Sequence, residues 1–300
     1  MICTWPRLIV AAIAVATAVG GWRATPSLAA GDLTLAALAK QTHFHGIAVD
    51  AKDTSRIYLA THHGLFVVGP DGKATPLSQS RDDFMGFTAH PSDPLVLYAS
   101  GHPESGGNLG FIVSTDGGRT WTKLASGVGG PVDFHQMDVS KADPKVIYGV
   151  YGDVQRSADG GKTWSKIGPA PEGLIGLAAS SKDANTLFAA TQKGLFKSTD
   201  GGRSWQIAHI ISRPATMVYA TREGDVYAYM VGTGLLRAKD ESPNWEIVSP
   251  GLGADVILHF AADPKDAKRF YAVTFNPQSG AQSVVASRDG GTNWVKLGSP

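Results

Sequence analysis

The chain has 300 residues but almost no cysteine, and it has no long apolar run beyond its first 30 residues. Its single cysteine is Cys3, so the remainder of the chain can form no disulfide and offers no thiolate to a metal ion. The apolar run at residues 8–19 is shorter than the roughly 20 residues that span a bilayer. These absences exclude a disulfide-rich scaffold and a cysteine-based metal or redox motif.

The first 30 residues have the three parts of a secretory signal peptide. Arg7 supplies the positive start, Leu8–Val19 the apolar centre, and Ser27–Ala29 a cleavage site of small residues. We therefore expect residues 1–30 to be removed and residues 31–300 to form a single domain in the periplasm or outside the cell. An uncleaved N-terminal anchor is the alternative interpretation.

An excess of charge of either sign is also missing. The full chain carries 27 basic and 26 acidic side chains, and loss of Arg7 and Arg23 with the signal peptide leaves 25 and 26, a formal charge of −1. Proteins that bind nucleic acid or an anionic membrane surface usually present a clear basic excess. We therefore expect no nucleic-acid partner, and no membrane insertion after cleavage.

What the sequence does contain is one octapeptide that returns five times. Four copies read STDGGRTW, SADGGKTW, STDGGRSW and SRDGGTNW, and a degenerate copy reads AKDESPNW. The tryptophans that end the copies are spaced by 43, 41, 40 and 49 residues. A period near 40 residues is typical of a repeat architecture.

Each repeat contains the strands and turns of one propeller blade. In the third repeat, short β-branched and aromatic runs at 133–139, 145–151 and 163–167 are separated by turn residues. Four antiparallel strands per repeat of this length form a blade, so we predict an all-β, six-bladed β-propeller, with seven blades as the alternative. The predicted blades cover residues 43–77, 83–124, 133–167, 173–207, 215–248 and 256–297. Residues 31–41 either add an outer strand that closes the ring or form a capping helix.

The octapeptide matches the Asp-box, or BNR repeat, S-x-D-x-G-x-x-W. Residues 43–297 therefore resemble the propellers of sialidases, sortilin-type receptors and photosystem assembly factors. In such a turn the aspartate accepts backbone N–H groups, glycine supplies a positive φ, and tryptophan buries its ring against neighbouring strands. We assign this structural role to Asp116, Trp121, Asp159, Trp164, Asp200, Trp205, Asp240, Trp245, Asp289 and Trp294. In the fourth copy Ser242 and Pro243 replace the glycines, so a distorted hairpin is expected.

Sialidase chemistry needs residues that this sequence does not supply in a recognisable pattern. The resemblance implies an arginine triad that clamps a carboxylate, a tyrosine nucleophile paired with glutamate, and an aspartic acid. Three arginines instead lie within Asp-box turns, at the outer edge of the predicted blades: Arg119, Arg203 and Arg288. Four carboxylates fall at blade tips without forming a clear acid and base pair: Asp83, Asp133, Asp153 and Glu172. No catalytic residue can be assigned, and whether the protein is an enzyme stays open.

The histidines form a second pattern that the fold does not explain, because seven of the nine lie between residues 43 and 135. In the predicted innermost strands of the first three blades, one column contains His43, Asp83 and Asp133, and a second contains His45, Met85 and His135. Side chains alternate along a strand, so both columns face the same side. Loops at the same end of the predicted channel carry His62, His63 and His102. Later blades have apolar or small residues there, such as Ile175 and Leu258.

Imidazole, carboxylate and thioether groups together predict a transition-metal site at one end of the channel. The predicted ligands are His43, His45, His62, His63, Asp83, Met85, His102, Asp133 and His135. Met85 favours a copper ion, which accepts a soft thioether, and zinc is the alternative. Two alternatives to a metal site remain. The residues could bind a small polar ligand, or the histidines could only cap strands or line a wet channel. His259 lies one place off the column and is not included.

The segments HFHGIAVD, ATHHGLF and DFHQMDV also resemble a bacterial family of secreted Asp-box proteins that are called glycosylhydrolase-like or exo-sialidase-like for their fold. This resemblance covers the whole mature chain and implies that the histidine motifs form one site. The function expected first is metal handling, or metal-assisted assembly of another extracytoplasmic protein. The alternatives are a glycoside hydrolase that uses the same funnel and a non-catalytic scaffold that binds a protein partner.

Overall fold

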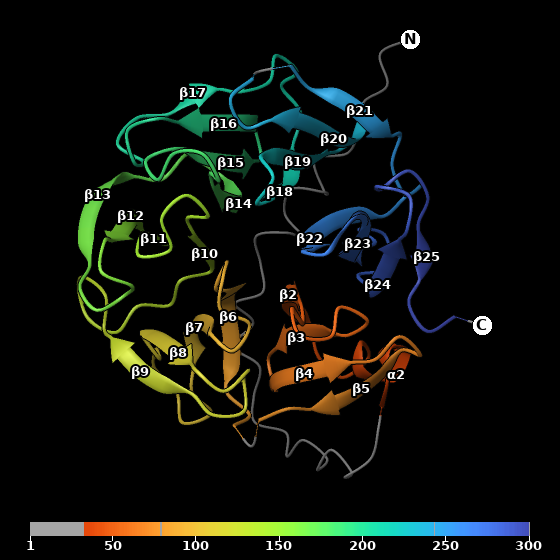
Figure 1. Ribbon diagram of the computed structural model, residues 1–300, viewed down its shortest axis with the longest axis horizontal. Helices are drawn as coiled ribbons and strands as arrows, with labels where there is room; N and C mark the ends of the chain where they lie inside the picture. The colour runs from red at the N-terminus through yellow and green to blue at the C-terminus, as the bar shows by residue number, and fades with distance from the viewer. Residues whose placement is uncertain (1–32, 79, 243, 300) are drawn as a thin grey trace.

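The computed structural model describes residues 33–299, except 79 and 243, as a ring of antiparallel sheets (Figure 1). The predicted signal peptide at residues 1–30 lies outside the described residues, and so does Pro243 of the degenerate Asp-box. Within the described part of the chain, no helix is both long and apolar enough to cross a membrane.

Six sheets surround one axis, and each is built from consecutive strands (Figure 1). Blade 1 contains β2 (Phe44–Val49), β3 (Ile57–Thr61), β4 (Gly64–Val68) and β5 (Lys73–Pro76). Blade 2 contains β6 (Asp83–Ala89), β7 (Leu97–His102), β8 (Phe111–Ser114) and β9 (Thr122–Ala125), and blade 3 contains β10 (Gln136–Val139), β11 (Ile147–Tyr151), β12 (Asp153–Ser157) and β13 (Ser165–Pro169). Blade 4 contains β14 (Leu174–Ala179), β15 (Leu187–Thr191), β16 (Gly194–Ser198) and β17 (Gln206–Ile207). Blade 5 contains β18 (Ala215–Ala220), β19 (Asp225–Met230), β20 (Gly234–Lys239) and β21 (Glu246–Ser249), and blade 6 contains β22 (Val256–Asp263), β23 (Asp266–Phe275), β24 (Gln282–Ser287) and β25 (Val295–Lys296).

This architecture confirms the predicted all-β, six-bladed propeller of four-stranded blades. The first strand of each blade is innermost and the fourth lies at the rim (Figure 1). Among the boundaries that differ from the prediction by a few residues, one bears on the site: β10 begins at Gln136 and not at Asp133. The Phe134 backbone N–H donates to Ser100 Oγ of blade 2 at 2.9 Å, which ties this segment to the neighbouring blade and away from β11.

The ring closes through side-chain packing between the first and last blades. Strand β1 (Leu33–Thr34) pairs with β5 at the outer edge of blade 1, and the short helix α2 (Leu35–Leu38) follows it, so the N-terminal segment supplies both a strand and a helix. Leu35 and Leu38 are buried in one apolar cluster with Tyr271 and Val273 of blade 6. The side chain of Gln282 also accepts from the Phe44 N–H at 2.6 Å and donates to the Phe44 carbonyl at 3.3 Å.

Four Asp-boxes have the same hydrogen bonds at the rim. In the second box, Asp159 Oδ1 accepts from the backbone N–H groups of Lys162 and Thr163 at 3.0 and 2.9 Å, and Oδ2 accepts from the Thr163 hydroxyl at 2.6 Å. These bonds lower the pKa of the Asp159 carboxyl to about 2. Equivalent bonds are made by Asp116, Asp200 and Asp289. In three boxes the tryptophan Nε1–H donates to the carbonyl of the second glycine: Trp121, Trp164 and Trp294.

The degenerate fourth box makes different contacts. Asp240 Oδ2 accepts from the Ser180 hydroxyl at 2.7 Å and from the Ser181 N–H at 2.9 Å, both in the turn between β14 and β15 of blade 4. The Trp245 Nε1–H donates to the Ala208 carbonyl, also of the preceding blade, at 3.0 Å. Asp240 and Trp245 therefore join blade 5 to blade 4.

Candidate metal centre

A central cavity of about 190 Å³ runs between the six innermost strands. His45, His135 and Gln136 line it close to where their inner strands begin, and Lys141 and Arg222 line it just beyond the ends of β10 and β18. His45 and His135, which the sequence places in blades 1 and 3, therefore lie at one mouth of the channel.

A β-bulge sets the position of His45. Phe44 pairs with Thr61 and Gly46 pairs with Ala60, so His45 is the extra residue on β2 and has no partner on β3. Burial first, and then the charge on the neighbouring imidazole of His62, lower the pKa of His45 to about 2. His45 is therefore uncharged at neutral pH, and one of its ring nitrogens carries a free lone pair.

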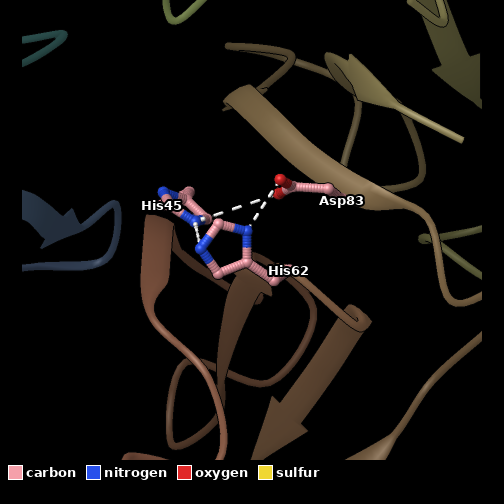
Figure 2. A group of neighbouring side chains, drawn as sticks. All are labelled: His45, His62 and Asp83. Atoms are coloured by element: carbon pink, nitrogen blue, oxygen red, sulfur yellow. Dashed lines mark hydrogen bonds and ion pairs between the residues drawn. The ribbon is translucent and has the colours of Figure 1, made fainter. Parts of the chain in front are cut away.

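Three side chains from two blades form a first group of possible metal ligands (Figure 2). His45 Nε2 and His62 Nε2 lie 3.0 Å apart, and His62 Nδ1 lies 2.7 Å from Asp83 Oδ2. His45 Nε2 is also 3.8 Å from Asp83 Oδ1. Two imidazole nitrogens bound to one zinc ion at about 2.0–2.1 Å would lie roughly 3 Å apart, so the spacing of the two Nε2 atoms suits a shared ion.

The carboxylate of Asp83 determines which ring nitrogen of His62 carries a proton. A carboxylate only accepts hydrogen bonds, so His62 Nδ1 must carry the proton that it donates to Asp83. Neutral His62 then presents a lone pair at Nε2, toward His45. No described residue donates a hydrogen bond to the buried Asp83 Oδ1. Leaving a buried acceptor without a partner costs about 1–3 kcal/mol, and a cation at this place would remove that cost.

A second group of three lies at the boundary between blades 2 and 3. Asp133 Oδ2 is 2.6 Å from His135 Nε2 and 3.0 Å from His102 Nε2. The Asp133 side chain is only 8% exposed, and no described residue donates to its second oxygen, Oδ1. The hydrogen bond to Asp133, and at longer range the charge of Asp83, raise the pKa of His135.

The ring of His102 is held by a backbone carbonyl. Its Nδ1 lies 2.8 Å from the Gly107 oxygen, so Nδ1 carries the proton and neutral His102 presents a lone pair at Nε2. That lone pair faces the Asp133 carboxylate, which is also an acceptor and cannot donate a hydrogen bond to it. The contact is favourable only with a second proton on His102 or with a metal ion between the two groups.

The two groups contain six of the nine predicted ligands. His43 is exposed beside the first group, with its ring centroid 5.6 Å from that of His62. His63 is half-buried in the turn between β3 and β4, where burial and the charge of Arg81 lower its pKa. Met85 is half-buried on β6, two residues after Asp83. His43, His63 and Met85 belong to neither group, and all three stay predicted ligands.

Sequence reasoning left out His259, which lines the central cavity. The pairing of β22 with β23 slips between Ile257 and His259, so Leu258 is an extra residue and the alternation of side chains is reset. Burial lowers the pKa of His259 to about 4, and His259 in turn contributes to lowering that of His45. Placing His259 in the channel would have required knowledge of this bulge. The spacing of residues in the sequence does not reveal it.

Two of the carboxylates considered for hydrolysis are paired with lysines. Asp153 Oδ2 lies 2.5 Å from Lys166 Nζ, and Glu172 Oε2 lies 2.5 Å from Lys193 Nζ. The other two, Asp83 and Asp133, belong to the histidine groups. The blade tips therefore hold carboxylates that contact histidine or lysine.

Comparison with known proteins supports the repeat and the fold. The family model for the BNR/Asp-box repeat matches residues 112–123 and 155–166. Among curated proteins, none matches this sequence.

Solved structures of similar fold include two glycoside hydrolases, of which this chain spans less than half the length. The GH74 xyloglucanase from Xanthomonas campestris is 18% identical with a TM-score of 0.56, and the GH74 enzyme from Niastella koreensis is 16% identical with a TM-score of 0.61. Each match covers 85% of this chain and 45% of the other. YCF48 bound to D1 peptide is 15% identical with a TM-score of 0.51, over 85% of this chain and 82% of that one.

At these identities the likeness concerns the fold and not the activity. The repeated octapeptide, the hydrogen bonds of the turns and the ring of six sheets all agree with it. The chain is therefore a six-bladed β-propeller built from BNR/Asp-box repeats.

Proposed function

We propose that this protein is an extracytoplasmic BNR propeller that binds a transition-metal ion at the histidine-bearing mouth of its channel. Copper is the first candidate and zinc the second. The role of the protein would be to hold the ion or to pass it to another extracytoplasmic protein during assembly. The proposal rests on one observation above all: His62 and His102 each have Nδ1 engaged by an acceptor, so each neutral imidazole directs the lone pair of Nε2 at a neighbouring ligand group, His45 or Asp133.

Histidines that ligate metals usually donate their other ring N–H to a carboxylate or a backbone carbonyl, and this orients the ring and raises its basicity. The Asp83 carboxylate has that relation to His62, and the Gly107 carbonyl has it to His102. Neutral imidazoles together with one carboxylate suit a divalent ion such as Cu²⁺ or Zn²⁺. The choice of copper depends on Met85, whose thioether would suit the softer ion.

Location outside the cytoplasm is part of the proposal, and it is supported by the signal-like residues 1–30. Mass spectrometry of the protein recovered from the periplasm or the medium tests it directly. A mature chain that begins at or near residue 30 is expected. An intact N-terminus that remains in the cytoplasm would contradict this part of the proposal.

Metal content is the direct test of the site. Protein purified without added chelator should contain copper or zinc, and metal-free protein should bind either ion in a titration against a chromogenic competitor. The double variant Asp83→Asn/Asp133→Asn should bind the ion about 10–100-fold more weakly at each group, because each carboxylate becomes a neutral amide of the same shape. A matched control is His209→Gln, since His209 lies at the rim beside Trp245.

A glycoside hydrolase is the alternative function, and the two GH74 structures of similar fold favour it over other enzyme classes. Turnover of a panel of aryl glycosides, sialosides and xyloglucan oligosaccharides would support it. Wild-type protein that binds neither copper nor zinc would overturn the metal proposal, whatever the panel shows. If the panel is also silent, a non-catalytic scaffold for a protein partner is the remaining function.

A further inference from the structure

The two groups of ligands share one His–Asp pair, which recurs at successive blade boundaries. Phe44 pairs with Thr61 in blade 1, and Phe84 pairs with Gly101 in blade 2. His62 and His102 are the next residues after these partners, so they occupy the same place in their blades. Each then contacts an aspartate at the start of the following blade: His62 contacts Asp83 through Nδ1 at 2.7 Å, and His102 contacts Asp133 through Nε2 at 3.0 Å.

One further histidine completes each group. His45 of blade 1 is added to the first pair, and His135 of blade 3 is added to the second. Within each group the three ligand atoms lie within 4.8 Å of one another, which is close enough for one ion. The repeat of the propeller accounts for the His–Asp pair in each group, and a histidine from the first blade of one pair and from the second blade of the other brings both sets to three donors.

We infer that the mouth binds two metal ions, one between blades 1 and 2 and one between blades 2 and 3. This inference rests on the proposed function, since it concerns the number and the character of the ions at the same mouth. Each set offers two imidazole nitrogens and one carboxylate, and each contains a buried carboxylate oxygen to which no described residue donates. Three donors leave positions open on either ion for a further ligand.

The two sites differ in their access to solvent. In the first, the side chains of His45 and His62 are 13% and 31% exposed. In the second, those of His102 and His135 are 43% and 53% exposed. An ion in the first site is therefore shielded and should be retained, whereas an ion in the second can exchange with solvent or with the ligands of another protein. The two sites together would form a storage position and an exchange position.

The charges of the two sites also influence each other. The two groups lie at neighbouring blade boundaries around one channel mouth, so charges bound at them act on each other. Two bound cations would accordingly repel one another, so the second ion should bind more weakly than the first. Binding should follow two steps in a titration.

The experiment is a titration of metal-free full-length mature protein with Cu²⁺, followed by equilibrium dialysis and metal analysis. Wild type should bind two ions in two steps. His62→Gln should bind one ion, in rapid exchange with a small chelator, and His102→Gln should bind one ion that the chelator removes at least tenfold more slowly. His209→Gln should behave as wild type, and circular dichroism should confirm that all four proteins are folded.

Each outcome decides between the possibilities. One ion in wild type that is lost in both variants would mean a single shared site and would overturn the two-ion inference. One ion in wild type that is lost in His62→Gln but kept in His102→Gln would remove the second site. In both cases the proposed function stands. No copper and no zinc in wild type would overturn the proposed function itself, and the two-ion inference with it.

Discussion

Blades 1 and 4 have the same turn at the channel mouth but different side chains on it. Between their second and third strands, blade 1 reads THHG at residues 61–64 and blade 4 reads TQKG at residues 191–194. In both turns the threonine hydroxyl donates to the glycine carbonyl at 2.9 Å. In both, the threonine Oγ1 accepts from the backbone N–H two residues on, at 2.9 and 3.0 Å. The geometry of the turn therefore does not depend on imidazole.

The innermost strands of blades 1 and 4 also share their backbone geometry but differ in the side chain at one position. His45 is the bulged residue of β2, and Ile175 is the bulged residue of β14 at the corresponding place. A bulge followed by glycine is thus compatible with an aliphatic side chain as well as with histidine. Blade 4 shows that this fold can be built without the histidines of blade 1, so their presence needs an explanation other than folding.

The largest effect is expected when blade 1 receives the residues of blade 4. The variant His45→Ile/His62→Gln removes two of the three donors of the first group. Because loss of even an outer partner of a ligand lowers metal affinity about 10–100-fold, the affinity of this group should fall by at least about 1,000-fold. Stability to urea should change by less than about 1 kcal/mol, since blade 4 carries the same residues. A competition titration and an unfolding curve measure the two effects.

His63→Lys is the matched control, because it also copies blade 4 but touches neither group. Metal affinity should stay within about twofold of wild type, a change worth under about 0.5 kcal/mol. An equal loss in His63→Lys would support His63 as a ligand, as the sequence predicts. If the metal-free His45→Ile/His62→Gln variant is unfolded or much less stable than metal-free wild type, the histidines are needed for the fold itself.

At the rim, a glycine of the Asp-box should matter more to stability than any histidine of the mouth. Gly161 has a φ of +91°, and a Cβ placed on it would lie 2.1 Å from Cε1 of Phe111. Gly161→Ala should therefore cost about 2–4 kcal/mol through backbone strain and overpacking, measured by chemical denaturation. Gly160→Ala is the control, because Gly160 also has a positive φ but faces open space. Equal losses in the two variants would assign the whole effect to the backbone.

A smaller effect is expected from removing one charge while keeping the shape. Asp83→Asn retains an acceptor near His62 but no longer carries a negative charge. The affinity of the first group should decrease about 10–100-fold, because the histidine becomes less basic and its orientation less fixed. If Asp83→Asn binds metal as well as wild type does, the carboxylate is not part of the site.

The hairpins at the rim could be predicted from the sequence, but the arrangement of side chains at the channel mouth could be predicted only in part. The Asp-Gly-Gly turns define hairpins at a constant spacing, and these set the blades to within a few residues. They also place His62, Asp83 and Asp133 at one end of the ring. The division into two groups depends on how neighbouring blades face each other, and the position of His259 depends on a bulge. Neither feature has a local sequence signal.

The rim and the channel mouth should respond to acid at different pH values. Hydrogen bonds from Thr163 lower the pKa of Asp159 to about 2, and those from Asn293 do the same for Asp289. An aspartate with a lowered pKa stabilises the fold above its unfolded value of about 3.9, and this contribution is lost as the pH falls toward 2. The melting temperature should therefore decline mainly below about pH 4. Metal should leave the second group earlier, because the raised pKa of His135 lets a proton displace the ion there at higher pH. Coincident loss of metal and fold would contradict this separation.

The smallest effect is expected from Met85, and it bears on the identity of the ion. If the thioether is a ligand, Met85→Leu should weaken Cu⁺ binding about tenfold and leave Zn²⁺ binding unchanged, because zinc has less preference for soft donors. Leucine has a similar volume, so stability should change by less than about 1.5 kcal/mol. Titrations with both ions under reducing conditions make the comparison. Equal affinities for Cu⁺ in the variant and wild type would remove the sequence-based reason for preferring copper, since the remaining imidazole and carboxylate donors suit zinc equally well.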